Sequence, residues 1–256
     1  MERQPFKDQS LQAPIDTAGP SEAWITVLGR LLRLPDQTAY SLVLRMKDPF
    51  QRDPVIEAIY EKVRRKHDLP SIEGIAATVF PRSFYLFNCK GDRRRLYKEF
   101  LTYHNRMARF FRKKPAFSYF HRLIAWQPEG MGEPVNQLEA FIGRMRELKA
   151  KREAWYFYPT IDPTRDLGKI FSGPCLTAVD LKYETKHNIL NLIAFYRDHE
   201  FAEKALGNYV GLAHLLEFLC KETKTKAGAI VCISLRARIE GGYVTDLERL
   251  LASVTK

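Results

Sequence analysis

The segment 173–215 constrains the fold most, because the spacing of its apolar residues changes from strand-like to helical. Its first half alternates or runs apolar in the manner of two strands, and the polar residues 184–188 are of suitable length for a hairpin turn. From Glu200 onward the apolar residues recur at helical intervals, which predicts a helix ending near Lys221. The segment therefore predicts two paired strands followed by a helix.

Three chemically useful side chains fall at the ends of these predicted elements. Cys175 begins the first strand, Arg197 follows the second, and Asn208 begins the helix. The ends of a hairpin's strands meet at one edge of a sheet, so Cys175 and Arg197 are expected to lie together, with Asn208 arriving from the helix side. This arrangement suggests a catalytic pocket.

The rest of the chain alternates between helical and strand-like patterns. Amphipathic spacing and capping residues predict helices over 21–34, 53–66, 93–111, 136–148 and 245–254. Strands are expected over 38–46, 154–158 and 229–235, whereas 72–80 fits either type. We expect a mixed α/β (α+β) sandwich, with 1–20 as a flexible arm and 21–256 as a single domain.

Composition excludes some classes and leaves others open. No apolar run approaches the roughly 20 residues of a membrane helix, and the polar N-terminus does not resemble a secretion signal, so we expect a cytoplasmic protein without membrane contact. The four cysteines lack CxxC spacing and the six histidines lack ligand spacing, so no metal is assigned. The net charge of +11 would suit nucleic acid, but solvated helix faces explain it more simply.

Several short motifs, in order, resemble the thymidylate synthase superfamily, which includes the pyrimidine-nucleotide hydroxymethylases. The motifs are LysGluPheLeu at 98–101, AsnGlnLeuGluAlaPheIle at 136–142, GlyProCys at 173–175 and TyrArgAsp at 196–198, followed by Glu200, Gly207 and Asn208. The resemblance covers roughly the last 160 residues, and it implies a mixed-sheet sandwich with surrounding helices.

The resemblance implies a pyrimidine nucleoside monophosphate as the ligand. A cysteine thiolate adds to carbon 6 of the base, which makes carbon 5 nucleophilic toward a one-carbon donor, and Cys175 is the matching nucleophile. Arg197 could promote ionisation of the thiol, and Arg197 and Arg152 would hold the phosphate. In the family one phosphate-binding arginine often comes from the partner subunit, so a homodimer is implied. The implied donor is 5,10-methylenetetrahydrofolate.

Further roles follow from the same resemblance. Asn208 would recognise the base edge of a uridylate, and Glu99 would relay protons through water. Tyr119 would handle the carbon 5 proton. Glu200 matches a substrate-binding aspartate, and Asp180 stands where the family has a glutamine.

Simpler interpretations of these residues remain open. A lone cysteine is often an inert core residue, and Arg197 could merely pair with Asp198 or Glu200. Asn208 could serve turn or capping chemistry, and Glu99 could be an ion-pair partner within a basic helix.

The chain also departs from the family pattern. Leu176 replaces a histidine, Asp198 replaces a serine, and the family's His-x-Tyr pair is absent from 234–239. The chain ends shortly after 234–239, where the family continues into a segment that closes over folate. A homologue that senses nucleotides or assembles with a partner without catalysis is therefore the alternative, and a basic nucleic-acid-binding protein is a third.

Overall fold

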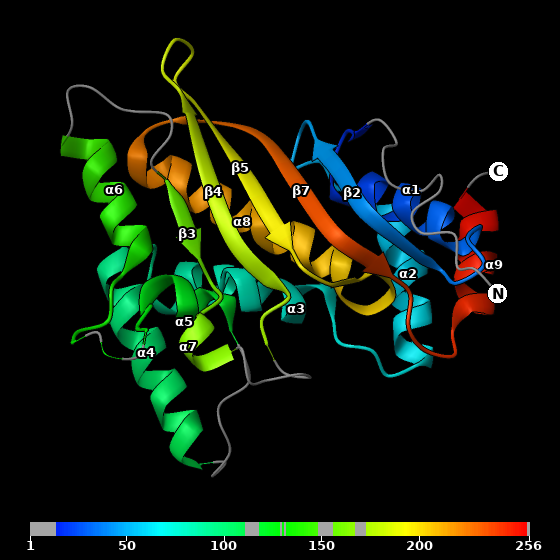
Figure 1. Ribbon diagram of the computed structural model, residues 1–256, viewed down its shortest axis with the longest axis horizontal. Coiled ribbons are helices and arrows are strands. Elements are labelled where there is room, and N and C mark those ends of the chain that lie inside the picture. Colours follow the sequence, from blue (N-terminus) through cyan, green and yellow to red (C-terminus); the bar gives the residue numbers. More distant parts are fainter. Residues whose placement is uncertain are drawn as a thin grey trace.

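A mixed β-sheet forms the centre of the protein (Figure 1). The computed structural model describes residues 14–110, 118–128, 130, 132–147, 156–166 and 173–254. Within these ranges the sheet has seven strands. They are β1 (Ile15–Thr17), β2 (Thr38–Met46), β3 (Phe157–Pro159), β4 (Leu176–Glu184), β5 (Ile189–Tyr196), β6 (His199–Glu200) and β7 (Lys226–Arg238).

The strand order is β1-β2-β7-β5-β4-β3, with β6 paired to β7. The strands β4 and β5 form the expected antiparallel hairpin, and β5 runs parallel to β7. The long strand β7 is antiparallel to β2, which is parallel to β1. The mixture of parallel and antiparallel pairs, with helices around the sheet, confirms the α+β class.

Helical elements surround this sheet. Those described are α1 (Pro20–Leu32), α2 (Pro54–Lys66), α3 (Ile72–Val79), η1 (Phe84–Asn88), α4 (Arg93–Phe110), α5 (Tyr119–Ile124), α6 (Gln137–Glu147), α7 (Pro163–Asp166), η2 (Phe201–Ala205), α8 (Leu206–Thr223) and α9 (Val244–Val254). Their starts follow local chemistry. Asp53 caps α2 by accepting from the backbone N–H of Val55 at 2.8 Å, and Asn136 caps α6 by accepting from that of Glu139 at 2.9 Å. Within the described residues, no helix is long and apolar enough to cross a membrane.

The central helix α8 passes behind β4, β5 and β7 in Figure 1 and covers one face of the sheet. It is buried on nearly every side, because α3 packs against its outer surface. A side chain at Gly207 could not be accommodated, since a Cβ there would lie 2.5 Å from the Cβ of Ile75. The segment 72–80, which the sequence left open, forms a helix over Ile72–Val79 with Ser71 as its N-cap, and Gly207 gives this helix room to pack on α8.

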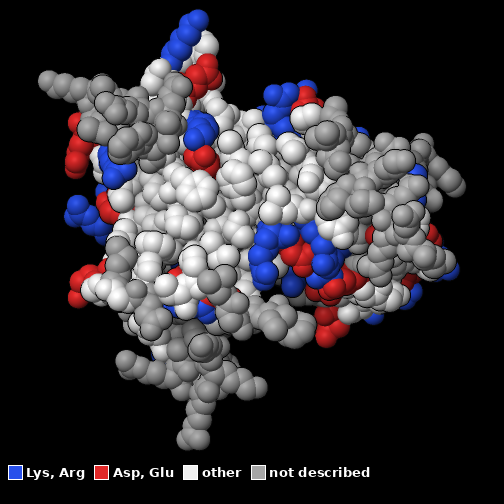
Figure 2. All heavy atoms as spheres, in the orientation of Figure 1, with Lys and Arg blue, Asp and Glu red and all other residues white. Residues whose placement is uncertain are grey.

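In the part of the chain that the structure describes, no helix lies over the centre of the opposite face of the sheet (Figure 1). The strand register places Phe157 and Leu235 on this face, where they are 56% and 57% exposed, and the rings of Phe157 and Phe195 lie 6.1 Å apart. Figure 2 shows the middle of this face as a broad area almost without Lys, Arg, Asp or Glu. The sheet therefore has one covered and one uncovered face.

Several boundaries differ from the sequence-based expectation. Residues 15–17 lie in the segment expected to be a flexible arm, yet they pair with Leu44–Met46 of β2, while residues 1–13 are outside the described part. The strand expected over 229–235 extends over Lys226–Arg238, where it pairs with β2 and β5. In both cases pairing with a neighbouring strand sets the boundary, and the local pattern cannot reveal this. Of the strand expected over 154–158, Phe157–Pro159 is observed, and residues 154–155 are outside the described part.

Candidate active site at one edge of the sheet

The β4–β5 hairpin brings Cys175 and Arg197 together as expected. Cys175 immediately precedes β4 and Arg197 immediately follows β5, and the backbone N–H of Arg197 donates to the carbonyl of Cys175 at 2.9 Å. The Arg197 guanidinium then turns toward the preceding loop, donating from Nε to Pro174 O at 3.0 Å and from Nη2 to Gly173 O at 3.1 Å. Arg197 therefore holds the loop that presents the cysteine.

Tyr119, the first residue of α5, lies against the same hairpin end. Its hydroxyl accepts from the backbone N–H of Leu176 at 3.4 Å. Burial raises the pKa of Tyr119, and the nearby Cys175 adds to that increase. The phenol is therefore neutral at physiological pH, which suits hydrogen bonding better than proton abstraction.

The thiol of Cys175 is half-buried, and its pKa lies above the ordinary value. Burial raises its pKa, and the negative charge of Asp198 raises it further. The positive charges of Lys204, Arg197 and Arg238 act in the opposite direction but do not prevail. Arg197 therefore acts on the thiol in the expected direction, but burial and Asp198 outweigh it.

Two further arginines, which the sequence analysis missed, lie close to this edge. Arg238 grips the carboxylate of Asp198 with Nε and Nη2, both at 2.9 Å, and Arg236 Nε approaches it at 3.2 Å. Burial alone would raise the pKa of Asp198, but the bond from Arg238 and the surrounding arginine charges outweigh it and lower that pKa. The two arginines stand at i and i+2 near the end of β7, and this spacing was the available signal.

Asn208 and Glu200 lie in the interior next to this edge. Asn208 Nδ2 is 3.2 Å from His199 Nε2, and His199 Nδ1 is 3.0 Å from the hydroxyl of Ser234. Burial lowers the pKa of His199 to about 3, so its ring is neutral and can accept from Asn208 while donating to Ser234. The amide expected to recognise a base therefore already has a partner inside the protein.

Glu200 caps the helical turn η2. Its carboxylate accepts from the backbone N–H groups of Ala202 at 3.0 Å and Glu203 at 2.6 Å. Burial raises the pKa of Glu200 to about 7, despite these two hydrogen bonds.

The described contacts of Glu99 and Asp180 do not include Cys175. Glu99 pairs with Arg95 at 2.5 Å on α4, with the thiol of Cys89 3.9 Å away. Asp180 lies within β4, where its carboxylate pairs with Lys182 at 2.9 Å. Arg152 is outside the described residues.

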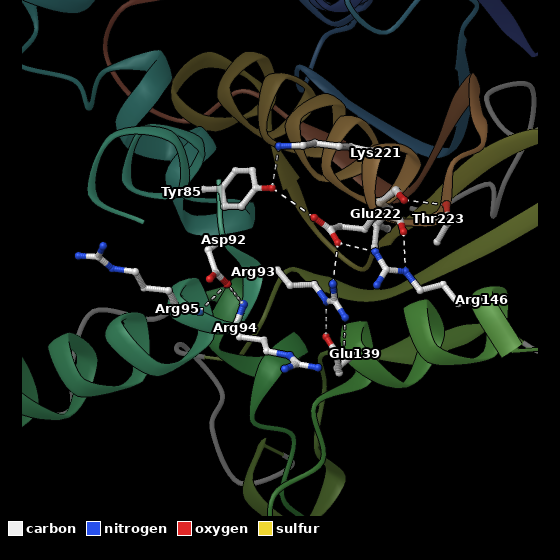
Figure 3. Close-up of polar contacts among 11 residues, drawn as sticks. Tyr85, Asp92, Arg93, Arg94, Arg95, Glu139, Arg146, Lys221, Glu222 and Thr223 are labelled. Carbon is white, nitrogen blue, oxygen red and sulfur yellow. Dashed lines mark hydrogen bonds and ion pairs between the residues drawn. The ribbon is translucent and has the colours of Figure 1, made fainter. Parts of the chain in front are cut away.

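A second group of charges joins α4, α6 and α8 (Figure 3). Glu222 accepts from Arg93 Nη1 and Arg146 Nη2, both at 3.0 Å, and from the hydroxyl of Tyr85 at 3.3 Å. Arg93 also pairs with Glu139 at 2.9 Å. Arg93 and Arg146, two of the cations behind the net charge of +11, are therefore already paired with carboxylates of the same chain.

Comparison with known proteins agrees with the resemblance read from the motifs. No protein-family model matches the chain. A protein of Methanococcoides burtonii named "Putative thymidylate synthase" is 27% identical over 140 residues, which are 54% of this chain and 59% of that protein. Proteins with the same name from Methanosarcina mazei and Methanosarcina barkeri are 26% and 28% identical over 125 and 127 residues, each match covering 48% of this chain and 52% of the relative.

The chain therefore spans about half the length of the curated relatives it matches. At this identity the agreement concerns the family and not the details of the site. The chain is a divergent, thymidylate synthase-like relative of these archaeal proteins.

Proposed function

We propose that the protein binds a pyrimidine nucleoside monophosphate at the edge formed by Cys175, Arg197 and Tyr119, and transfers a one-carbon unit to carbon 5 of its base. The observation that carries this proposal is the meeting of a cysteine and an arginine at the end of the β4–β5 hairpin, with a 2.9 Å backbone hydrogen bond between them. The thymidylate synthase-like relatives support the reaction class.

In the proposed reaction the thiol of Cys175 first loses its proton, and the thiolate forms a bond to carbon 6 of the pyrimidine. The electrons of the 5,6 double bond move toward O4, so that carbon 5 can attack the one-carbon donor. Carbon 5 then loses its proton and the sulfur leaves, which restores the double bond. Because the pKa of Cys175 is raised, the first deprotonation is the costly step.

The neighbouring residues would position the ligand. Arg197 keeps the loop before Cys175 in place, and the exposed part of its guanidinium faces solvent, where a phosphate can reach it. The neutral hydroxyl of Tyr119 would orient a water molecule that carries the carbon 5 proton. Asn208 could recognise the base only by exchanging its hydrogen bond with His199.

A methylenetetrahydrofolate donor is a proposal without an identified binding site. The described cavities of about 270, 260 and 180 Å³ are lined by other parts of the fold, and none of these three includes Cys175 or Arg197. None of these three cavities therefore joins a folate to the proposed nucleophile.

The uncovered sheet face supports the homodimer that the resemblance implies. A second copy of the chain would bury Phe157 and Leu235, which are large apolar side chains exposed on one face. Leu235→Glu should give a folded monomer in sedimentation experiments. Val55→Glu is the matched control, since Val55 is 62% exposed on α2 and should not affect assembly. A wild-type monomer, or a dimer that tolerates Leu235→Glu, would contradict this arrangement.

The test of the reaction measures binding and chemistry separately. A thermal-shift panel of uridylates and cytidylates, with and without methylenetetrahydrofolate, identifies the ligand. Release of label from carbon 5 then reports covalent activation of the base. Cys175→Ala should retain binding and lose label release, whereas Cys220→Ala, on α8, should retain both. Label release by Cys175→Ala at the parental rate would exclude the covalent mechanism.

A nucleotide-binding protein without catalysis is the second candidate. The raised pKa of Cys175 favours it, because a protonated thiol does not add to carbon 6. Tight binding of a nucleotide with no exchange at carbon 5 across the neutral and alkaline range would support this candidate over the enzyme.

A further inference from the structure

Three arginines and one carboxylate converge beside Cys175. Arg197 follows β5, whereas Arg236 and Arg238 belong to β7, which runs parallel to β5. The parallel register places the ends of both strands together, and Asp198 lies between the two sets of cations. The charges of Asp198, Arg197 and Arg238 all act on the thiol of Cys175, so these groups share one electrostatic environment.

The geometry around Asp198 is that of a bound anion. Arg238 presents two nitrogens of its planar fork at 2.9 Å, and Arg236 adds a third contact at 3.2 Å. A phosphate group offers guanidinium groups the same planar pairs of oxygen atoms that a carboxylate does. The donors that hold Asp198 are therefore chemically suited to an external phosphate.

The accessibility of these groups allows an exchange. The side chain of Asp198 is 26% exposed and that of Arg236 is 44% exposed, so neither is locked in the core. Arg238 is more buried, but it also pairs with Glu240 and so keeps a partner when Asp198 leaves. The Arg197 guanidinium, which holds the adjacent loop, marks the side from which an anion would approach.

We propose that Asp198 is an internal competitor for a phosphate site built by Arg197, Arg236 and Arg238, and that the ligand's phosphate binds by displacing its carboxylate from Arg236 and Arg238. The inference rests on the proposed function for the identity of the ligand, a phosphomonoester. It adds two binding arginines, and it makes Asp198 the residue that limits affinity.

Inorganic phosphate tests the site without requiring a base. Asp198→Asn keeps the shape of the side chain but removes the competing charge, and it should bind phosphate at least tenfold more tightly than the parent in calorimetry. Its affinity should also fall more steeply with salt, because more unpaired positive charge faces the ligand. Asp180→Asn is the matched control, because it removes another carboxylate of the β4–β5 hairpin. The carboxylate of Asp180 pairs with Lys182 and not with these arginines, so this substitution should leave the phosphate affinity unchanged.

Two further variants distinguish the removal of charge from a structural effect. Asp198→Ser should show the same increase in phosphate affinity, and Asp198→Asn combined with Arg236→Gln should lose most of that increase.

The reactivity of the Cys175 thiol supplies an independent measurement. Because Asp198 raises the pKa of Cys175, alkylation of Cys175 in Asp198→Asn should reach its half-maximal rate at lower pH. Cys89, Cys220 and Cys232 are buried and have raised pKa values, so the rapid alkylation phase reports Cys175.

The outcomes separate this inference from the proposed function. Phosphate affinity that is the same in folded Asp198→Asn, Asp198→Ser and Asp180→Asn would overturn the inference, whatever nucleotides do. A gain in phosphate affinity that depends on Arg236 would support it. If that gain occurs while no pyrimidine nucleotide binds, the proposed function fails and the phosphate site stands.

Discussion

The protein contains two arginine–carboxylate clusters of similar composition that differ in surroundings. Glu222 on α8 is contacted by Arg93 and Arg146 from two other helices, and its side chain is 10% exposed (Figure 3). Asp198, at the sheet edge, is contacted by Arg236 and Arg238 from a single strand, and its side chain is 26% exposed. The first cluster joins separate elements, whereas the second adds little to the connectivity of the fold.

This difference indicates that similar ion pairs can have different roles, one in stability and the other in anion binding. Glu222 is the more deeply buried acceptor, so its removal deletes three hydrogen bonds that water replaces poorly, although Arg93 keeps Glu139 and Arg146 is partly exposed. A cluster open to solvent at a strand end can lose a partner at low cost and exchange it for a ligand. The comparison therefore predicts that substitution of Glu222 lowers stability more than substitution of Asp198. It also predicts that substitution of Asp198 changes anion binding more than substitution of Glu222.

The largest effect is expected for Glu222→Ala. It removes the acceptor of three hydrogen bonds, from Arg93, Arg146 and Tyr85, and should lower the free energy of unfolding by about 3–4 kcal/mol. Glu217→Ala on the same helix is the matched control, because its pair with Arg82 is about half exposed and should contribute less than about 1 kcal/mol. Urea unfolding of both variants measures the difference, and equal losses would break the proposed contrast.

The carboxylate of Glu200 is buried and accepts its hydrogen bonds from backbone N–H groups, and its raised pKa makes the stability of the protein depend on pH. The folded protein retains a proton on Glu200 between pH about 4.5 and 7, where the unfolded chain has released it. The contribution of Glu200 to stability therefore falls as the pH rises through this window. Between pH 4 and pH 8, the free energy of unfolding of Glu200→Gln, measured with urea, should rise by about 3 kcal/mol relative to that of the parent. A difference between the two proteins that stays constant with pH would contradict the raised pKa.

A smaller effect on stability is expected at Asp198. Asp198→Asn should cost about 1 kcal/mol, because Arg238 retains Glu240 and the side chain of Arg236 is well exposed. The same urea experiment measures it. A loss as large as that of Glu222→Ala would mean that the edge cluster is a structural element, and the contrast between the two clusters would disappear.

Much of the fold could be predicted from local pattern. Strand β2 and helix α2 begin and end where the sequence indicated, because a run of strand-forming residues or a cap such as Asp53 defines them locally. The residues of α3 could not be assigned from their short apolar pattern, although Ser71 caps this helix and α8 packs against it, far away in the sequence. Local signals define elements, but contacts between distant elements decide the ambiguous ones.

The site was predictable only in part for the same reason. Cys175 and Arg197 belong to one hairpin, so their meeting follows from the sequence pattern. The contact between Asp198 and Arg238 depends on the parallel pairing of β5 with β7, which are separated in the sequence by α8. No local pattern indicates the register of these two strands. Burial of Asn208 against His199 likewise emerges only when α8 packs on the sheet.

The smallest effect is expected at Glu99, where the structure and the resemblance lead to different outcomes. Glu99→Gln breaks only a surface pair with Arg95 and should leave the urea midpoint unchanged within error. None of its described contacts reaches Cys175, so label release from carbon 5 should also be unchanged. A loss of a hundredfold or more, in a variant of unaltered stability, would instead support the proton-relay role that the resemblance implies. It would also require that α4 approach Cys175 when the ligand is bound, because Glu99 must then act on a water molecule beside the base.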